Sequence, residues 1–376
     1  MTAITARSAS RLVLAFAITT ACLGMASADP LPAVAAGIDA KIPAWAPLHG
    51  HARPLVAIVG DNAGTELTDF VIPYGVFKRA GIDTIALAAH DGPFRFRPAL
   101  KARLDATLAQ FDGTHPEGAD YVVVPAVTNA DDAVLLAWIA AQSRKGATVV
   151  AICDGALVLG NAGLLQGKWA TAHWASESQR LQRFPGTHWL RNVRYVVDGN
   201  IVSSSGISAA MPTSIALVEA MLGHERATAL AAGLGVADWG PRHDSDAFRP
   251  HYGNLKVFAV KLAINPLRGG ELVGIRLEEG IDEIALAVTA DAWSRTGRSR
   301  AVSIATSAGA VASRNGLVFL PDAVGATDDI AMVLPLTSAD APARAFDAAL
   351  AGIATRYGRK TAHAVAIDFE YPGFVP

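Results

Sequence analysis

The sequence predicts an α/β protein, with a doubly wound parallel sheet covered by helices on both faces and a second, shortened α/β domain of similar topology. Short strands that are apolar along their whole length alternate with stretches of helical spacing, which is typical of a parallel sheet with both faces covered. The last part of the chain repeats this pattern in shortened form. Hydrophobic residues make up 51% of the 376 residues, which is enough for two cores.

The first domain is predicted over residues 53–235. An apolar strand comes first, a loop of small and polar residues follows, and a helix then ends at Gly81, a typical C-cap position. The expected strands are 55–59, 84–88, 121–125, 148–152 and 201–204, and the expected helices are 69–80, 131–145 and 213–222.

Residues 1–28 have the pattern of a signal peptide. Arg7 and Arg11 supply the positive region, residues 12–18 form a short apolar stretch, and Ala-Ser-Ala at 26–28 is a typical cleavage site. The apolar stretch is too short to span a bilayer.

We therefore expect a periplasmic or secreted protein, cleaved before Asp29. A lipoprotein anchored through Cys22 is the less favoured alternative, because Thr19 stands where a larger aliphatic residue is usual. Residues 29–52 are rich in Ala and Pro and are expected to form a lead-in segment.

Residues 236–270 are predicted to be a linker, because they hold turn and breaker signals such as Arg249-Pro250. His243 and His251 within this linker are expected at the surface. The run His49-Gly50-His51 lacks further ligands, so we predict no metal site there. The loop from Gly60 to Gly64 lacks the Gly-Lys-Ser/Thr ending of a phosphate loop, and no cofactor is predicted.

Residues 271–376 are predicted to be a degenerate copy of the first domain. The strand Leu272-Val273-Gly274-Ile275 echoes Leu55-Val56-Ala57-Ile58. Sliding one copy on the other places Ala285 at the position of Asp69, and the copy has no room for a cysteine turn. We therefore expect a chemically silent half that packs against the first.

The charge balance bears on the class of partner. The chain carries 32 basic and 34 acidic residues, and this near-neutrality argues against nucleic-acid binding, which needs a basic face. No later segment is long and apolar enough to span a membrane. The expected partner is a small-molecule substrate or ligand.

The candidate nucleophile is Cys153. The apolar run 148–152 stops at this cysteine, and a small-residue turn then opens a helical stretch. A thiol at such a turn points out of the sheet edge, and a helix N-terminus favours the thiolate. If Cys22 is removed with the signal, no internal disulfide can form. The alternative is a buried cysteine that serves as a small hydrophobe.

Two further residues can act with this thiol. His173 follows far enough along the chain for one helix and a return to the same sheet edge, where its imidazole would accept and return a proton. Asp69 follows the first strand, and the carboxyl ends of neighbouring strands line one crevice. A carboxyl there would share a proton with the thiol or activate water. A packing role for His173 and an N-cap role for Asp69 are the alternatives.

These positions resemble the DJ-1/PfpI superfamily, within the class I glutamine-amidotransferase-like fold. The resemblance covers residues 53–235 and is nearest to the branch of isonitrile hydratases and amidase-like domains of AraC-type regulators. It rests on three segments: the run from Ala151 to Trp174, Asp69-Phe70-Val71-Ile72-Pro73, and Ser205-Gly206-Ile207-Ser208.

The resemblance implies a flavodoxin-like sandwich in which Cys153 is the nucleophile, Asp69 its acid partner and His173 a neighbour of the thiol. It also implies an oxyanion site formed by the N–H of Asp154 and an N–H of the Ala126–Val127 turn. The family often dimerises, so a homodimer is one expected arrangement.

The sequence departs from the family pattern at three points. Ala126 and Val127 stand where the family usually has glycines, and a Cβ there restricts the backbone angles. Asp154 replaces the threonine that is common in isonitrile hydratases. No helix-turn-helix pattern follows in this sequence, so the interpretation as a transcriptional regulator lacks a DNA-binding domain.

Two functions follow as hypotheses. The first is an exported cysteine-dependent hydrolase or hydratase that acts on a small carbonyl, amide or nitrile-like compound. The second is a non-catalytic small-molecule or redox sensor that uses the same thiol to bind a ligand or to oxidise reversibly. Thiol-dependent turnover distinguishes them.

Overall fold

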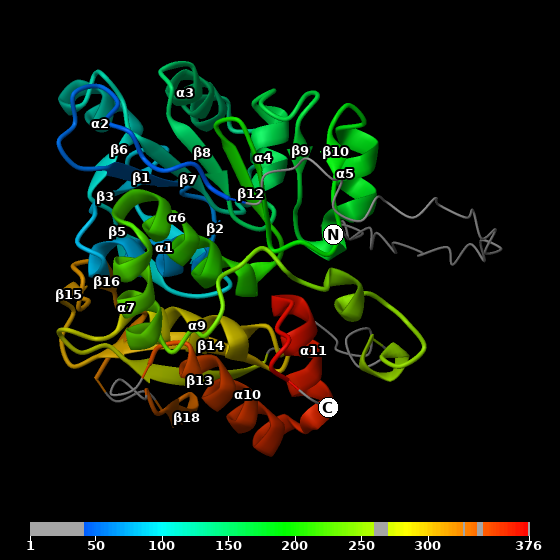
Figure 1. The fold of residues 1–376 in the computed structure, drawn as a ribbon. Helices are drawn as coiled ribbons and strands as arrows, with labels where there is room; N and C mark the ends of the chain where they lie inside the picture. Colours follow the sequence, from blue (N-terminus) through cyan, green and yellow to red (C-terminus); the bar gives the residue numbers. More distant parts are fainter. Residues whose placement is uncertain (1–40, 259–269, 326–327, 337–340, 375–376) are drawn as a thin grey trace, which may run out of the picture. The chain divides into compact units, whose positions relative to one another are not determined.

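The computed structural model of the protein describes residues 41–258, 270–325, 328–336 and 341–374. The predicted export signal, Cys22 and the first part of the predicted lead-in segment lie outside these residues. Figure 1 shows the described elements. None of the described helices combines the length and hydrophobicity that a membrane crossing requires.

The first domain is built on a seven-stranded sheet in the order β11-β12-β8-β7-β1-β3-β6 (Figure 1). All neighbouring strands are parallel except β11 and β12. The first strand lies between the second and third major strands, which is the strand order of flavodoxin-like folds and confirms the predicted fold class. The strands are β1 (Leu55–Gly60), β3 (Asp83–Ala88), β6 (Ala106–Thr107), β7 (Tyr121–Val124), β8 (Thr148–Ala151), β11 (Tyr195–Asp198) and β12 (Ile201–Ser204).

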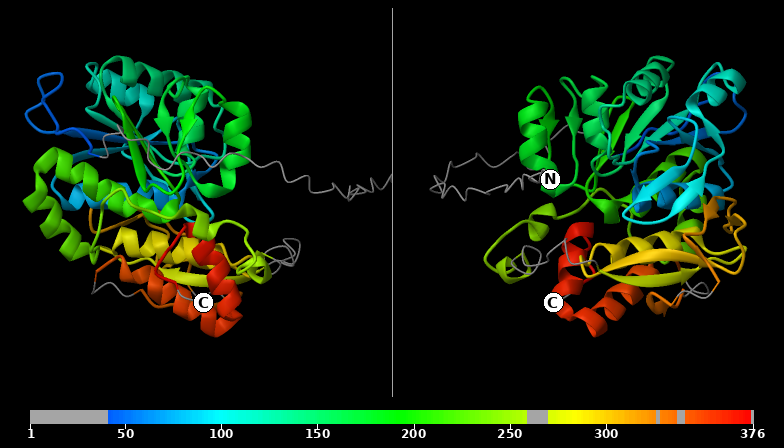
Figure 2. Two further views of the ribbon diagram at one scale, coloured as in Figure 1. Left: turned by 45° about the vertical axis from the view of Figure 1, so that its right-hand side comes forward. Right: turned by 180° about the vertical axis from the view of Figure 1, so that it is seen from behind.

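Helices cover both faces of this sheet (Figure 2). Alternate residues of the central strands belong to two different buried clusters. Val56 and Ile58 belong to the same buried cluster as the apolar residues of α1 (Leu67–Arg79) and α6 (Ala210–Leu222). Ala57 and Val59 belong to the cluster on the opposite face. That face is covered by α2 (Leu108–Thr114), α3 (Ala133–Arg144) and α4 (Gly155–Asn161).

The second half is also α/β, as predicted. Its four-stranded sheet has the order β17-β14-β13-β18, and all its pairs are parallel. The strands are β13 (Glu271–Arg276), β14 (Ser299–Ala305), β17 (Ala323–Val324) and β18 (Ile330–Leu334), and the helices are α9 (Glu283–Ser294), α10 (Arg344–Tyr357) and α11 (Arg359–Phe369).

A small mixed sheet joins the two halves, because β16 of the second half pairs with β5 of the first. Its strands are β2 (Thr65–Glu66), β4 (Phe94–Arg97), β5 (Lys101–Arg103), β15 (Val311–Ala312) and β16 (Val318–Leu320). The remaining elements are β9 (Trp169–Ala170), β10 (His188–Trp189), α5 (Glu177–Arg183), α7 (His224–Leu234) and the short helices η1 (Trp174–Ser176), η2 (Ile207–Ala209) and η3 (Ser245–Phe248).

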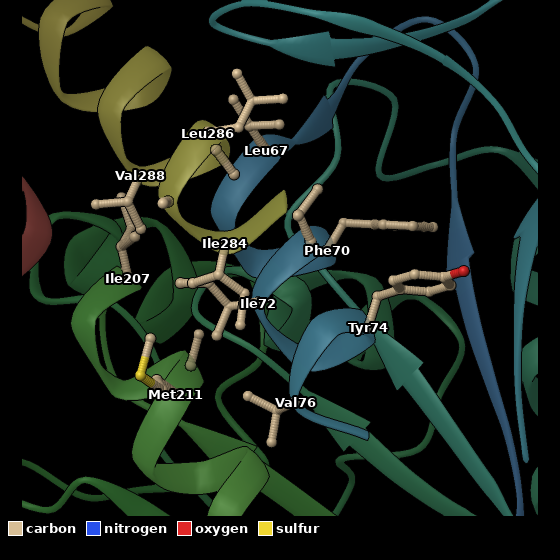
Figure 3. Packing of buried hydrophobic residues seen from close by; sticks show 14 of the residues in the cluster. Leu67, Phe70, Ile72, Tyr74, Val76, Ile207, Met211, Ile284, Leu286 and Val288 are labelled. Carbon is tan, nitrogen blue, oxygen red and sulfur yellow. The ribbon is translucent and has the colours of Figure 1, made fainter. Parts of the chain in front are cut away.

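The first helix of each half forms the main contact between the halves. Both α1 and α9 are buried along nearly their whole length, so each helix has an apolar face toward its own sheet and another toward its counterpart. Figure 3 shows buried side chains of α1 and α9, among them Leu67, Ile72, Ile284, Leu286 and Val288. Phe70 of α1 packs instead on Phe94 and Phe96 of β4.

Two reciprocal ion pairs tie these helices together. Arg79, in the last turn of α1, lies 2.6 Å from Asp282, which is the N-cap of α9. Arg295, the C-cap of α9, lies 2.7 Å from Glu66, which is the N-cap of α1. Since each helix end meets the start of the other helix, α1 and α9 run antiparallel.

We predict that the Arg295–Glu66 pair is important for stability. The Glu66 side chain is only 3% exposed, so replacing Arg295 with leucine leaves a buried carboxylate without its cation. The free energy of unfolding, measured by urea denaturation at pH 7, should fall by about 3 kcal/mol. Arg53→Leu is the control, because Arg53 and Asp83 form an exposed pair whose loss should change stability by less than about 1 kcal/mol. Similar losses in the two variants would contradict this account.

Candidate active site

Cys153 lies at a sharp turn between β8 and α4. Its φ of 56° is in the left-handed region, which is uncommon for a residue other than glycine and marks a strained backbone. The Cys153 N–H donates to the Ser204 hydroxyl at 3.2 Å, which ties the turn to the end of β12. A Cβ on Gly155 would lie 2.0 Å from the carbonyl oxygen of Val124, so only glycine lets α4 begin so close to β7.

The thiol itself is buried and neutral. Cys153 is 5% exposed and packs in the same apolar cluster as Ile152, Ile207 and Ala210. Burial, and then the negative charge of nearby carboxyl groups with Asp69 first, raise the pKa of the Cys153 thiol well above its ordinary value. The expectation that the turn favours the thiolate is therefore opposed by the structure. Desolvation disfavours the thiolate more than the N-terminus of the short helix α4 stabilises it.

Asp69 is fully buried in the first turn of α1, where Glu66 rather than Asp69 is the N-cap. One carboxyl oxygen of Asp69 accepts the Ala126 N–H at 3.3 Å. The other oxygen has no hydrogen-bond partner among the described residues. Burial and the neighbouring charge of Glu66 raise the pKa of Asp69 well above its ordinary value, which favours the protonated form of this carboxyl.

Glu66 is the ionised member of this carboxyl pair. Burial opposes its ionisation, but a hydrogen bond with Asp291 and the charge of Arg295 lower the pKa of Glu66. Its carboxylate accepts the Asp69 N–H at 2.6 Å. Two neighbouring carboxyl groups therefore have pKa values that are shifted in opposite directions, an arrangement that is common where acid–base chemistry occurs.

The backbone donors near the thiol only partly match the expectation. The N–H of Ala126 is occupied by Asp69. In the described part of the chain, the N–H groups of Asp154 and Val127 have no recorded acceptor, which leaves these two for a developing negative charge. Neither Ala126 nor Val127 has a positive φ, so their Cβ atoms impose no strain at this turn.

His173 is held by backbone groups on both sides of its ring. Its Nδ1 accepts the Ala175 N–H at 3.2 Å, and its Nε2 lies 3.0 Å from the carbonyl oxygen of Asp368. These contacts imply a neutral ring with the proton on Nε2. No hydrogen bond between His173 and Cys153 is found within the described residues, so a role of His173 as the base for the thiol stays a prediction.

The structure adds two charged residues that the sequence analysis missed. Glu370, at the end of α11, accepts the Trp174 N–H at 2.9 Å and contacts His243 Nε2 at 2.8 Å. Arg180 is 1% exposed and donates to the His173 carbonyl oxygen at 2.6 Å. The prediction that His243 lies at the surface is wrong, since its side chain is 5% exposed.

No local motif pointed to Glu370, because it lies in the half that was predicted to be chemically silent. Its contacts depend on how α11 docks, and residue spacing does not encode this. Across the described residues, no group of three or more histidine, cysteine or acidic side chains is arranged to hold a metal ion.

Comparison with known proteins gives the following similarities. Residues 55–220 match the DJ-1/PfpI family. The chain is 37% identical to isonitrile hydratase of Pseudomonas putida over 97 residues, which are 26% of this chain and 41% of that protein. It is 28% identical over 110 residues to the HTH-type transcriptional regulator CdhR of Pseudomonas aeruginosa, covering 29% of this chain and 32% of the regulator. The chain thus spans less than half the length of either protein.

Protein dj-1beta of Drosophila melanogaster is matched over most of its own length. It is 26% identical over 181 residues, which are 46% of this chain and 93% of that protein. Its crystal structure aligns with a TM-score of 0.45 and 24% identity, over 49% of this chain and 99% of that chain.

The raised pKa of Asp69 predicts how stability depends on pH. Above about pH 4, where an ordinary aspartate ionises, folding must take up a proton at Asp69, so this carboxyl lowers stability increasingly as pH rises toward its raised pKa. Asp69→Asn, which is neutral at every pH, should match wild type near pH 4 and become progressively more stable than wild type toward pH 8. Urea denaturation of both proteins across this range measures the difference.

Asp83→Asn is the control for this series, because Asp83 is exposed and paired with Arg53. It should show no such growing stabilisation with pH. An Asp69→Asn variant that loses stability relative to wild type as pH rises would show that Asp69 is ionised in the folded protein.

Proposed function

Since residues 55–220 form a DJ-1/PfpI family domain, we propose that this protein is a cysteine-dependent hydrolase or hydratase that acts on a small carbonyl, amide or nitrile-like compound. The observation that supports this most is the pairing of a strained, elbow-placed thiol with a protonated carboxyl. Cys153 has a φ of 56°, and an ionised Asp69 would raise the pKa of its thiol further, so the two groups do not both carry a negative charge. Burial favours the neutral form of each group before substrate binds.

A neutral pair suits addition across a polarised multiple bond. The sulfur of Cys153 bonds to the electrophilic carbon while its proton passes through Asp69 to the other atom of the multiple bond. The N–H groups of Asp154 and Val127 stabilise the negative charge that develops on that atom. Water then attacks the same carbon, the carbon–sulfur bond breaks, and a proton returns to the sulfur. The sum is addition of one water to a nitrile-like group. With an amide, the carbon–nitrogen bond breaks before water attacks, the amine leaves with a proton from Asp69, and water then releases the acid from the thioester, so that the sum is hydrolysis.

The charges around the thiol favour uncharged substrates. Glu66 and Glu370 both have lowered pKa values and both disfavour a negative charge on Cys153. The same two carboxylates would repel an anionic substrate. A compact, neutral electrophile fits this environment best.

One observation favours the alternative of a non-catalytic sensor. The thiol is only 5% exposed, which restricts access to it. A redox sensor, however, reacts through its thiolate, and the raised pKa of Cys153 opposes that chemistry. The alternative is therefore a protein that binds a small neutral ligand near Cys153 without turnover.

A substrate screen tests the proposed enzyme. We expect turnover of at least one compound among small nitriles, isonitriles, amides and aldehydes. Cys153→Ala should abolish it, and Asp69→Asn should reduce kcat roughly 10²- to 10⁴-fold through loss of the proton carrier. Thermal unfolding of both variants verifies that they fold. Equal turnover by wild type and Cys153→Ala, or binding without turnover across the panel, would refute the enzyme.

We also propose that the protein is exported and cleaved after residue 28, on the strength of the signal pattern in residues 1–28. Expressed from its full sequence in a Gram-negative host, the protein should accumulate in the periplasm with Asp29 as its first residue, as read by N-terminal sequencing. Ala28→Leu should block cleavage. An intact Met1 in the cytoplasm, or a lipid-modified Cys22, would contradict the proposal.

A further inference from the structure

We propose that Glu370, contributed by the C-terminal half, is a positioning residue of the Cys153 site, an inference that rests on the proposed function of that site. The residue lies outside the segment that matches the DJ-1/PfpI family, residues 55–220. It caps α11 with a φ of 53°, a left-handed conformation that a residue with a side chain adopts at some cost in free energy.

The Glu370 carboxylate lies fully buried at the centre of a polar cluster. One oxygen accepts the Trp174 N–H at 2.9 Å and lies 3.9 Å from His173 Nε2. The other oxygen contacts His243 Nε2 at 2.8 Å and accepts the Ser245 hydroxyl at 3.2 Å. Both oxygens thus have partners, which a buried charge requires.

The end of α11 also holds the segment that begins at His173. Trp174 Nε1 donates to the Ile367 carbonyl oxygen at 3.2 Å, and His173 Nε2 contacts the Asp368 carbonyl oxygen at 3.0 Å. The Glu370 carboxylate accepts the Trp174 N–H as well. Three contacts therefore hold this segment to the second half.

A second loop beside the thiol docks on the same residue. Ser208 donates its hydroxyl to the Glu370 carbonyl oxygen at 2.6 Å. A Cβ on Gly206 would lie 2.6 Å from the Glu370 side chain, so glycine is needed for this approach. Ser204, two residues before Gly206, accepts the Cys153 N–H at 3.2 Å. Glu370 is thereby connected to the cysteine turn through one short loop.

The negative charge of Glu370 also affects the pKa of the Cys153 thiol. Burial opposes ionisation, but the hydrogen bond with His243 and the proximity of His173 lower the pKa of Glu370, so it carries a negative charge. That charge contributes to the raised pKa of the Cys153 thiol. The second half is therefore not chemically silent, because it sets both the loops and the charge around the nucleophile.

Alkylation of Cys153 tests this inference without any substrate. The full chain carrying Cys22→Ser, so that Cys153 is the only thiol, is treated with iodoacetamide across a pH series. Glu370→Gln keeps the size of the side chain and removes the charge, so it should lower the thiol pKa and make alkylation at pH 8 about threefold faster. Glu370→Asp keeps the charge and should leave the thiol pKa near that of the parent chain.

Glu271→Gln is the matched control in the same half. Glu271 is exposed and pairs with Arg356 and Tyr357, whereas the carboxyl groups that raise the pKa of Cys153 are those of Asp69, Asp154, Glu66 and Glu370. This variant should alkylate like the parent chain. Once a substrate is known, both Glu370 variants should also lower kcat, roughly tenfold, because the loops lose their anchor.

A folded Glu370→Gln variant with the parent thiol pKa overturns the inference. If that variant fails to fold, Ser208→Ala decides, because it removes only the hydroxyl that donates to the Glu370 carbonyl. Its limiting alkylation rate at high pH should rise several-fold, and an unchanged rate overturns the inference. If no compound is turned over by wild type while the thiol pKa shifts in Glu370→Gln, the proposed enzyme fails and the inference about Glu370 stands.

Discussion

The antiparallel contact between α1 and α9 controls the protonation of the active site. Arg295 of α9 reaches across to Glu66 and helps to keep that buried carboxyl ionised. The ionised Glu66 in turn favours the proton on Asp69, and it also disfavours a negative charge on the Cys153 thiol. A charge pair between the two halves is therefore linked, through Glu66, to the protonation of both Asp69 and Cys153.

The two halves share the site from a second direction. Glu370 and the carbonyl group of Asp368, at the end of α11, hold the segment that starts at His173, while the contact between α1 and α9 supports Asp69. The second α/β half thus has a physical role as the support of the half that carries the cysteine turn. The contact between the halves is reciprocal. The arginine at the end of each helix, Arg79 or Arg295, pairs with the acidic N-cap of the other helix, Asp282 or Glu66.

The sequence was sufficient for the parts of the fold that depend on local pattern. Uniformly apolar strands such as 55–59 and 148–152 predicted the parallel sheet, and the small-residue turn after Ile152 predicted where the thiol stands. What it could not predict depends on packing between distant segments. The pKa of Cys153 follows from burial in a core to which distant segments contribute, and the ring of His173 is held by Asp368, which lies near the other end of the chain. Glu66 gave no such local signal, because Ser, Thr, Asp and Asn rather than Glu are the typical N-cap residues.

The central claim is that Asp69 and Cys153 are both protonated in the resting protein. Infrared difference spectroscopy between wild type and Asp69→Asn at pH 7 tests it most directly, because a protonated carboxyl has a carbonyl stretching band that a carboxylate lacks. The account predicts that wild type shows this band, that Asp69→Asn loses it, and that the Cys153 S–H stretch is present in both. A carboxylate band assigned to Asp69, with no S–H stretch from Cys153, would contradict the account.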